Sequence, residues 1–361
     1  MSHADGLFVG LMSGTSLDAV DAVLLRCGTR PELVATHSHP IPPLLREQVL
    51  ALCLPGDNEI DRLGSTHLSL GELFADATLS LLEKASIAAT DVLAIGCHGQ
   101  TVRHRPEAGF TMQIGSADVL ACRTGIAVVT DFRNRDMVLG GQGAPLVPLF
   151  HRALWGEAGR MAVLNIGGMA NITLLVDGEI TAGFDTGPGN VLMDGWIQRH
   201  QTIPYDADGL WAASGAIQPA LLARLLSDPY FALPAPKSTG RERFHLNWLE
   251  DQLGAESGAD VQATLLALTS RSIVDALMPL APDRVLVCGG GAHNQALMAS
   301  LRAGLGGIPV LPTDDAGLAA DWVEGAAFAW LAWARLNGVP GNATCVTGAR
   351  TSSVLGALYL P

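Results

Sequence analysis

Charged and aromatic residues are scarce in this sequence, at 16% and 5% of its 361 residues. Basic residues are rarer than acidic ones, and the formal net charge is −13. Nucleic-acid binding depends on basic patches that neutralise phosphates, so this balance argues against a nucleic-acid partner. It does not argue against a nucleoside triphosphate, because a few backbone N–H groups and a metal ion can hold one triphosphate locally.

Long apolar runs and paired cysteines are also missing. No stretch approaches the ~18 uninterrupted apolar residues of a membrane span, and the N-terminus lacks the basic segment of a signal peptide. The cysteines are scattered without a C-x-x-C pair, which predicts buried thiols in a reducing cytosol rather than a metal site. They are Cys27, Cys53, Cys97, Cys122, Cys288 and Cys345. We therefore expect a cytoplasmic protein without a membrane segment.

Apolar residues, in contrast, make up 48% of the chain, which is ample for two cores at a prior of about 150 residues per domain. Helical spacing of apolar residues predicts helices over 43–53 and 63–85. Short apolar runs predict strands at Val92–Gly96 and Ala127–Asp131. Alternation of this kind predicts an α/β protein with a mixed, largely parallel sheet covered by helices in each half.

One pattern occurs twice. In residues 9–21 and again in 163–173, an apolar strand runs into a turn of Gly, Ser, Thr or Asn, and a second apolar strand follows. The outgoing strands are Val20–Leu25 and Ile172–Val176. A repeat period of about 150 residues indicates duplication of a whole domain. Two such turns facing one another would clamp a polyphosphate, because N–H groups of tight turns form anion-binding concavities.

Three polar turns are candidate phosphate sites. The turn Ser13–Asp18 adds hydroxyl donors to backbone N–H groups, and Asp18 or Asp21 could hold Mg²⁺ through water. Its counterpart begins at Asn165. The glycine-rich turn after Val287 joins a strand to a helix and could accept phosphate or adenine. Read one at a time, each is also compatible with an ordinary turn.

Two acidic residues are candidates for chemistry. Asp185 follows a strand-like segment, 179–184, and precedes a Gly-Pro-Gly run that leaves space for a ligand; an Asx turn is the alternative. Glu324 shares an apolar helix face with Phe328 and Leu331, so its carboxylate needs a partner or a ligand. Alternatively, it faces solvent at the helix start, where acidic residues are favoured.

His98 and Arg133 each come just after a predicted buried strand, where α/β proteins place ligand-binding residues. Arg133 could offer its guanidinium to a carboxylate or phosphate. Either residue could instead make structural hydrogen bonds.

Taken together, these segments resemble the anhydro-N-acetylmuramic acid kinase family. The matching stretches run from about residue 7 to 356, in family order. They are Gly10-Leu-Met-Ser-Gly-Thr-Ser-Leu-Asp, His98-Gly-Gln-Thr-Val, Asp131-Phe-Arg, Gly140-Gly-Gln-Gly-Ala-Pro-Leu-Val-Pro, Asn165-Ile-Gly-Gly, Phe184-Asp-Thr-Gly-Pro-Gly-Asn, Cys288-Gly-Gly-Gly-Ala-His-Asn, Glu324-Gly-Ala-Ala-Phe-Ala-Trp-Leu-Ala and Val346-Thr-Gly-Ala. Ala19, where a Gly is common, and Met137-Val-Leu, where smaller residues are usual, depart from the pattern.

The resemblance implies a fold of two duplicated actin-like (ribonuclease H-like) domains with an ATP cleft between them. On this basis we place the N-terminal domain at 1–132 plus about 342–361, and the C-terminal domain at 133–341. A homodimer is expected on the same basis.

The resemblance also implies a reaction: ATP phosphorylates O6 of 1,6-anhydro-N-acetylmuramic acid while water opens the anhydro bridge, as in bacterial cell-wall recycling. Asp185 would be the base that activates the water, and Glu324 an acidic substrate contact. Ser13, His98 and Arg133 match substrate-binding residues, with Arg133 suited to the lactyl carboxylate. The positions that match or extend the ATP site are Gly14, Thr15, Ser16, Leu17, Asp18, Ala19, Val20, Asp21, Gly167, Gly168, Gly289, Gly290, Gly291 and Asn294. Mg²⁺ is the expected metal, without assigned ligands.

Three alternatives remain. A kinase of the same fold could act on another sugar or acid, but a plain hydroxyl kinase needs one base and no activated water. A non-catalytic ATP or sugar sensor would have no need to keep Asp185 and the first turn. A glycosidase would have no use for duplicated phosphate turns.

Overall fold

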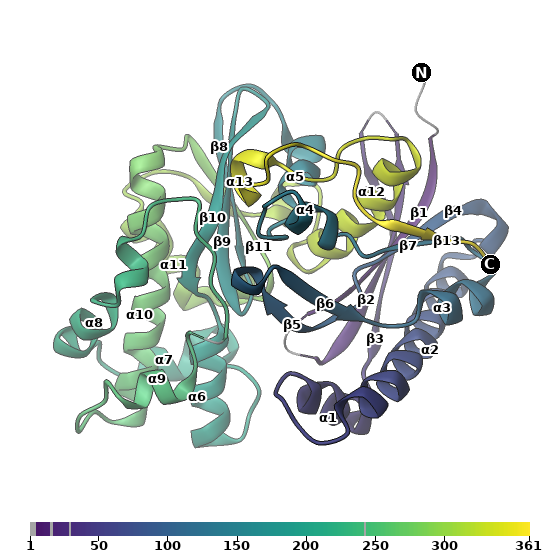
Figure 1. The fold of residues 1–361 in the computed structure, drawn as a ribbon. Helices are drawn as coiled ribbons and strands as arrows, with labels where there is room; N and C mark the ends of the chain where they lie inside the picture. The colour runs from purple at the N-terminus through teal and green to yellow at the C-terminus, as the bar shows by residue number, and fades with distance from the viewer. Residues whose placement is uncertain (1–4, 15–16, 29, 242) are drawn as a thin grey trace. The chain divides into compact units, whose positions relative to one another are not determined.

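The computed structural model describes residues 5–14, 17–28, 30–241 and 243–361. The chain forms two compact units (Figure 1). Unit 1 consists of Met1–Leu154 and Trp322–Pro361, and unit 2 of Trp155–Asp321.

Unit 1 is built on a six-stranded sheet with the order β13-β7-β4-β1-β2-β3. Strands β1, β2 and β3 are successively antiparallel, whereas β4 is parallel to β1 and β7 is parallel to β4. The C-terminal strand β13 closes the edge antiparallel to β7. A separate hairpin is formed by β5 and β6. The bounds are β1 Gly6–Ser13, β2 Ala19–Cys27, β3 Glu32–Pro40, β4 Val92–Cys97, β5 Gln100–Arg105, β6 Phe110–Ile114, β7 Val128–Thr130 and β13 Ala357–Tyr359.

Unit 2 repeats this topology in a five-stranded sheet with the order β10-β9-β8-β11-β12. Here β8, β9 and β10 are successively antiparallel, and β11 and β12 continue the sheet in parallel from β8. Each strand thus has a counterpart in unit 1: β8 corresponds to β1, β9 to β2, β10 to β3, β11 to β4 and β12 to β7. This correspondence confirms the predicted duplication. The bounds are β8 Arg160–Ile166, β9 Met169–Val176, β10 Glu179–Pro188, β11 Arg284–Cys288 and β12 Val310–Pro312.

Helices cover both faces of the unit 1 sheet. Leu7, Val9 and Leu11 of β1 join a core with Leu70 and Phe74 of α2, while the other face packs against α12. The bounds are α1 Pro43–Leu52, α2 Glu59–Ala85, α3 Ala117–Thr124, α4 Asn134–Val138, α5 Pro148–Trp155, α12 Val323–Leu336 and α13 Thr344–Thr347.

Two strand glycines allow α12 to lie directly on the sheet. A Cβ added at Gly10 would sit 1.9 Å from the carbonyl oxygen of Gly325, and one at Gly96 would sit 2.0 Å from that of Phe328. Such distances are impossible for real atoms, so both positions require glycine. The close approach brings the first turn of α12, with Glu324, over β1 and β4.

The unit boundaries differ from those expected from the sequence, which fall after residues 132 and 341. Residues 133–154 and 322–341 belong to unit 1. The reason is packing: α12 lies against β1, β2 and β4 of unit 1. Sequence order alone does not show which sheet a helix covers.

Unit 2 has its own core, centred on α10 and the apolar strands. The 23-residue helical stretch Gly258–Leu280, which contains α10, is long and apolar enough to span a membrane, but 67% of its apolar window is buried inside the structure. Burial of this kind is typical of a core helix. The bounds are α6 Val191–Gln201, α7 Leu210–Ser214, α8 Pro219–Leu226, α9 Leu246–Glu250, α10 Gly258–Leu277 and α11 Gln295–Gly304.

The cysteines, all in the described part of the chain, carry thiols. Cys27, Cys97 and Cys288 are buried, as predicted. Cys53 is partly buried, whereas Cys122 and Cys345 are exposed, so the prediction of burial is wrong for the last two and holds only in part for Cys53. The two exposed cysteines stand in short helices, Cys122 in α3 and Cys345 in α13.

Candidate functional site

Three of the predicted substrate-binding residues follow parallel strands of unit 1. Ser13 ends β1, His98 comes directly after β4, and Arg133 comes three residues after β7 ends at Thr130. The carboxyl ends of parallel strands meet at one edge of a sheet, which is where α/β proteins bind ligands. His98 is fixed to its neighbouring strand by a backbone hydrogen bond, 3.1 Å long, from its N–H to the carbonyl oxygen of Leu11.

Arg133 and His98 are directly hydrogen bonded. Nε and Nη2 of Arg133 lie 3.0 and 2.9 Å from Nε2 of His98, and Nη1 donates to the carbonyl oxygen of Gly143 at 2.7 Å. Burial and the adjacent Arg133 hold the pKa of His98 well below 6.5. Burial also lowers the pKa of Arg133 to about 10, against the opposing effect of Glu324 and Asp136. The pair is therefore a neutral imidazole beside a guanidinium cation.

Glu324 belongs to the same group of residues. Burial raises the pKa of its carboxyl above 4.5, and Arg133 opposes that rise. One helical turn later, Phe328 packs its ring against His98, with ring centroids 4.8 Å apart. Residues four apart share a helix face, so Glu324 lies on the side of α12 that meets His98. The sequence predicted a partner or a ligand for the Glu324 carboxyl, and Arg133 is such a partner through its charge.

Gln100 joins these candidate residues, although no sequence motif singled it out. The buried hydroxyl of Ser13 donates to Oε1 of Gln100 at 2.6 Å. Gln100 stands two residues after His98 and opens β5. Gly99 between them has a φ of +74°, so the chain turns there and strand periodicity does not relate the two side chains. Ser13, His98, Gln100, Arg133 and Glu324 all belong to unit 1.

Asp185 belongs to unit 2, where residues 230–239 make several hydrogen bonds with it. Its N–H donates to the carbonyl oxygen of Lys237 at 3.0 Å, and its Oδ2 accepts from the backbone N–H of Thr239 at 2.9 Å. Its own carbonyl oxygen accepts from the hydroxyl of Tyr230 at 2.7 Å. Lys237 is partly buried, which lowers the pKa of its ammonium, while Asp185 opposes that effect.

The predicted position of Asp185 at the end of a strand is wrong. Strand β10 continues to Pro188, and Asp185 lies inside it, next to a register shift against β9 between Asp185 and Gly187. A bulge of this kind redirects side chains and is common next to functional sites. Gly187 and Pro188, which suggested a turn, are part of this irregular strand end, and Gly189 follows it.

Glycine-rich segments of unit 2 converge near the end of β8. The carbonyl oxygens of Gly167 and Gly168 accept from Asn190 and Gly189, at 2.8 and 2.9 Å. A Cβ at Gly289, where φ is +78°, would lie 2.4 Å from Oδ1 of Asn165. Three segments that the sequence analysis named are thus brought together: 165–168, 189–190 and 289–291.

The other predicted nucleotide-binding residues have varied surroundings. Gly14 accepts a hydrogen bond from Leu17 at 3.3 Å, and the exposed Asp18 lies 3.9 Å from Arg46. Ala19, Val20 and Asp21 belong to β2, where Asp21 accepts from the hydroxyl of Ser38 at 3.2 Å. Thr15 and Ser16 lie outside the described residues. Asn294 caps α11 by accepting from Leu297 at 3.0 Å, and Gly290 and Gly291 begin a short 3-10 turn before it.

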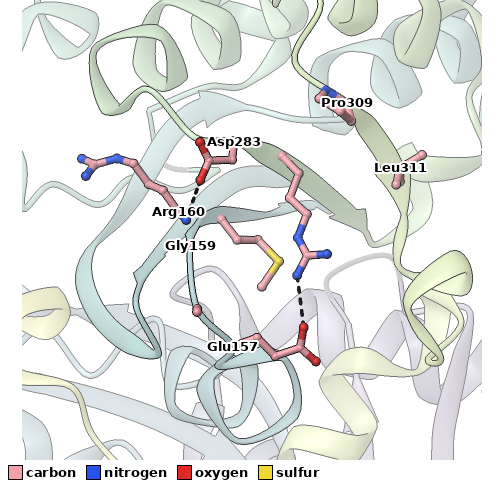
Figure 2. Close-up of a pocket in the computed structure, with 9 residues that line it drawn as sticks. Glu157, Gly159, Arg160, Asp283, Pro309 and Leu311 are labelled. Atoms are coloured by element: carbon pink, nitrogen blue, oxygen red, sulfur yellow. Dashed lines mark hydrogen bonds and ion pairs between the residues drawn. The ribbon is translucent and has the colours of Figure 1, made fainter.

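Unit 2 contains a pocket of about 300 Å³ (Figure 2). It lies at the amino ends of three parallel strands. Arg160 begins β8, Arg284 begins β11, and Leu311 is the second residue of β12. Its polar lining is already paired: Glu157 with Arg284, and Asp283 with the N–H of Arg160 at 2.8 Å. None of the predicted site residues lines it.

Comparisons with known proteins agree with the sequence motifs. The family described as anhydro-N-acetylmuramic acid kinase matches residues 6–361. The anhydro-N-acetylmuramic acid kinase of Bordetella parapertussis (strain 12822) is 52% identical, over 99% of this chain and 97% of that protein. The one from Shewanella pealeana is also 52% identical, over 98% of both.

Similarity to solved structures is more distant. The activator of 2-hydroxyisocaproyl-CoA dehydratase from Clostridium difficile, with bound ADPNP, aligns with a TM-score of 0.46 and 10% identity, over 91% of this chain and 94% of that one. The resemblance seen in the sequence is confirmed by the family match and the curated relatives: this chain belongs to the anhydro-N-acetylmuramic acid kinase family.

Proposed function

We propose that this chain is an ATP-dependent kinase that converts 1,6-anhydro-N-acetylmuramic acid and water to N-acetylmuramic acid 6-phosphate and ADP. Family membership supports the reaction class. The proposed roles belong to the residues of the two units described above, and a cytoplasmic location fits a reaction that consumes ATP.

The observation that carries the proposal is the hydrogen-bonding state of Arg133. A guanidinium has five N–H donors. Three of these donors, on Nε, Nη1 and Nη2, bond His98 and Gly143. One N–H on Nη1 and one on Nη2 therefore remain. These two N–H groups can donate hydrogen bonds to a carboxylate, the anion that a guanidinium matches best. The lactyl group of muramic acid supplies a carboxylate, so Arg133 distinguishes this sugar from one without that group.

Asp185 acts as the general base. It takes a proton from water as the water oxygen bonds to the anomeric carbon, and the bond from that carbon to O6 breaks. The released O6 forms a bond to the γ-phosphorus of ATP, and ADP leaves with the electrons of the broken phosphoanhydride bond. Water enters opposite the leaving oxygen, as in an inverting glycosidase. The hydrogen bonds from Thr239 and Tyr230 hold Asp185 in one orientation for this step.

Glu324 and Ser13 contact the sugar in this proposal. Burial raises the pKa of the Glu324 carboxyl, and Arg133 opposes that rise; we assign this carboxyl to a hydrogen bond with the sugar. Ser13 is held by Gln100, and its hydroxyl oxygen remains able to accept from a sugar hydroxyl.

The nucleotide is assigned to the turn that begins at Gly14 and to the glycine segments of unit 2. No group of three or more His, Cys, Asp or Glu side chains in the described ranges is arranged to hold a metal ion. That fits Mg²⁺, which binds mainly to phosphate oxygens and water with one or two protein carboxylates. Asp18 or Asp21 would supply the carboxylate, and the ion would neutralise charge on the phosphates.

The test is turnover of 1,6-anhydro-N-acetylmuramic acid with Mg-ATP in ¹⁸O-labelled water. We expect a 6-phosphorylated product with the label on the anomeric oxygen. A phosphorylated product that retains the anhydro bridge would exclude the coupled reaction. Absence of turnover, together with binding of sugar and nucleotide, would favour a sensor.

Asp185→Asn tests the assigned base. We expect turnover to fall by at least ~10²-fold, the lower range for a lost general base, with sugar binding retained. Asp275→Asn is the matched control, since Asp275 is an exposed residue of the same unit that pairs with Arg271. Near-normal turnover in Asp185→Asn would remove Asp185 from this role.

A further inference from the structure

Asp136 is a fully buried carboxylate of unit 1 that the reaction described above does not use. It stands three residues after Arg133, in the short helix α4. Its Oδ1 accepts from Nδ2 of Asn342 at 2.6 Å and from the hydroxyl of Thr347 at 2.7 Å. Its Oδ2 accepts from the backbone N–H of Gly143 at 2.8 Å. A buried carboxylate needs such partners, and here every one of them is a hydrogen-bond donor.

These bonds hold the loop 140–143 in place. The N–H of Gly141 donates to the carbonyl oxygen of Asp136 at 2.9 Å, and the N–H of Gln142 donates to that of Thr347 at 2.9 Å. A Cβ at Gly141 would lie 2.2 Å from Oδ2 of Asp136, so the loop lies directly on this carboxylate. The loop therefore has little freedom to move while Asp136 keeps its bonds.

The loop in turn determines where Arg133 lies. The carbonyl oxygen of Gly143 accepts from Nη1 of Arg133 at 2.7 Å, and the N–H of the same residue is the one held by Asp136. Gly143 is thus bonded on both sides, to Asp136 through its N–H and to Arg133 through its carbonyl. The other edge of the guanidinium is fixed by His98. Because hydrogen bonds hold the guanidinium at Nη1 and at Nε and Nη2, its orientation is fixed, and so is that of the remaining N–H groups on Nη1 and Nη2.

We propose that Asp136 is a positioning residue that, through Gly143, aims the guanidinium of Arg133 at the carboxylate of the substrate. The inference rests on the proposed function and deepens it, because it assigns recognition of the lactyl group to a chain of three residues. Asp136 itself does not contact substrate.

Asp136→Asn keeps the shape but places an NH₂ group among donors. The new NH₂ group then points either at the N–H of Gly143 or at the donors of Asn342 and Thr347. Asn342 cannot relieve this clash by reversing its amide, because its Oδ1 accepts from the N–H of Ser353 at 2.7 Å. The expected consequence is displacement of the loop and of Arg133.

The measurement is the affinity for two sugars, 1,6-anhydro-N-acetylmuramic acid and 1,6-anhydro-N-acetylglucosamine, which lacks the lactyl group, by calorimetry without ATP. We expect the wild type to prefer the muramic sugar, and Asp136→Asn to lose at least ~10-fold of that preference, the order of a hydrogen bond to a charged group. In turnover, KM for the muramic sugar should rise by the same factor while KM for ATP stays unchanged.

Asp206→Asn is the matched control for burial. Asp206 is a buried carboxylate of unit 2 that accepts from the N–H groups of Trp211 and Ala212, both at 2.9 Å, and from Gln262 at 3.1 Å. Its substitution should lower the melting temperature without changing the sugar preference. Thr347→Val removes one bond to Asp136 and should lower the preference by a few-fold, whereas Thr347→Ser, which keeps the hydroxyl, should restore it. This pair tests the inference even where Asp136→Asn does not fold.

The outcomes separate the two proposals. Absence of sugar binding by the wild type would overturn the proposed function itself. An unchanged preference in Asp136→Asn, with normal wild-type binding, would overturn only the positioning role. Tighter binding of the muramic sugar by Asp136→Asn would also overturn it, because Asp136 would then act merely as an anion that competes for Arg133.

Discussion

Arg133 donates from both Nε and Nη2 to a single acceptor, Nε2 of His98, at 3.0 and 2.9 Å. An arginine has no acceptor, so Nε2 must carry the lone pair and the ring proton must be on Nδ1. The lowered pKa of His98, caused by burial and by Arg133, agrees with a neutral ring. His98 is thus a fixed support for the guanidinium rather than a proton carrier.

Arg133→Lys should impair sugar binding while leaving nucleotide use intact. Lysine keeps the positive charge but cannot bond His98, Gly143 and a carboxylate in one plane. We expect KM for the muramic sugar to rise at least ~10-fold, the order of one lost charged hydrogen bond, with KM for ATP unchanged. Steady-state kinetics provide the measurement, and Arg135→Lys, an exposed change two residues away, is the control. Equal KM values in the wild type and Arg133→Lys would contradict the assignment.

Tyr230→Phe should slow turnover without weakening sugar binding. The change deletes only the hydroxyl that donates to the carbonyl oxygen of Asp185 at 2.7 Å, and the ring keeps its packing against Phe244. We expect a loss of stability of about 1 kcal/mol, typical of one hydrogen bond, and a several-fold fall in kcat. Tyr205→Phe, at a residue 61% exposed, is the control. A fall in stability with kcat unchanged would show that Tyr230 supports only the fold.

Gly10→Ala should destabilise unit 1 strongly. The new methyl group would lie 1.9 Å from the carbonyl oxygen of Gly325 and 2.5 Å from the nitrogen of Ala329, so α12 would have to move off the sheet. We expect a loss of about 3 kcal/mol or more, at the upper end for overpacking, seen in denaturant unfolding. Gly64→Ala, in α2 with nothing within 4 Å of the new Cβ, should instead stabilise by about 0.5–1 kcal/mol. A neutral Gly10→Ala would contradict the close contact.

The buried His151 and the partly buried His104 should make stability fall in acid. Burial lowers the pKa of His151 to about 3 and, together with Arg133, that of His104 to about 4. Below pH 6.5 the unfolded chain binds protons that the folded chain excludes, so stability decreases as the pH falls from 6.5 toward these values. Each histidine contributes a slope of up to about 1.4 kcal/mol per pH unit.

His151→Gln should remove one such contribution. Denaturant unfolding between pH 7 and 4 should give a shallower decline for His151→Gln than for the wild type. His293→Gln, at an exposed residue, should leave the decline nearly unchanged. The same slope in all three proteins would mean that His151 becomes charged without leaving the folded structure.

Strand positions and the duplication followed from the sequence because they depend on local patterns. The apolar run at Val92 became β4, the two outgoing hairpin strands became β2 and β9, and the sheet order repeats in both units. The unit boundaries did not follow, because the attachment of α12 to the unit 1 sheet depends on contacts between distant segments.

The site shows the same division. The sequence by itself proposed Ser13, His98, Arg133, Asp185 and Glu324 as candidates, because their types stand out in their local segments and these segments match a family pattern. Only the tertiary structure decided which of them meet. Asp136, Gln100, Tyr230 and Thr239 act through hydrogen bonds to residues far along the chain, or through backbone groups that any residue type could offer. Such partners are set by how the chain packs, and no local pattern records them.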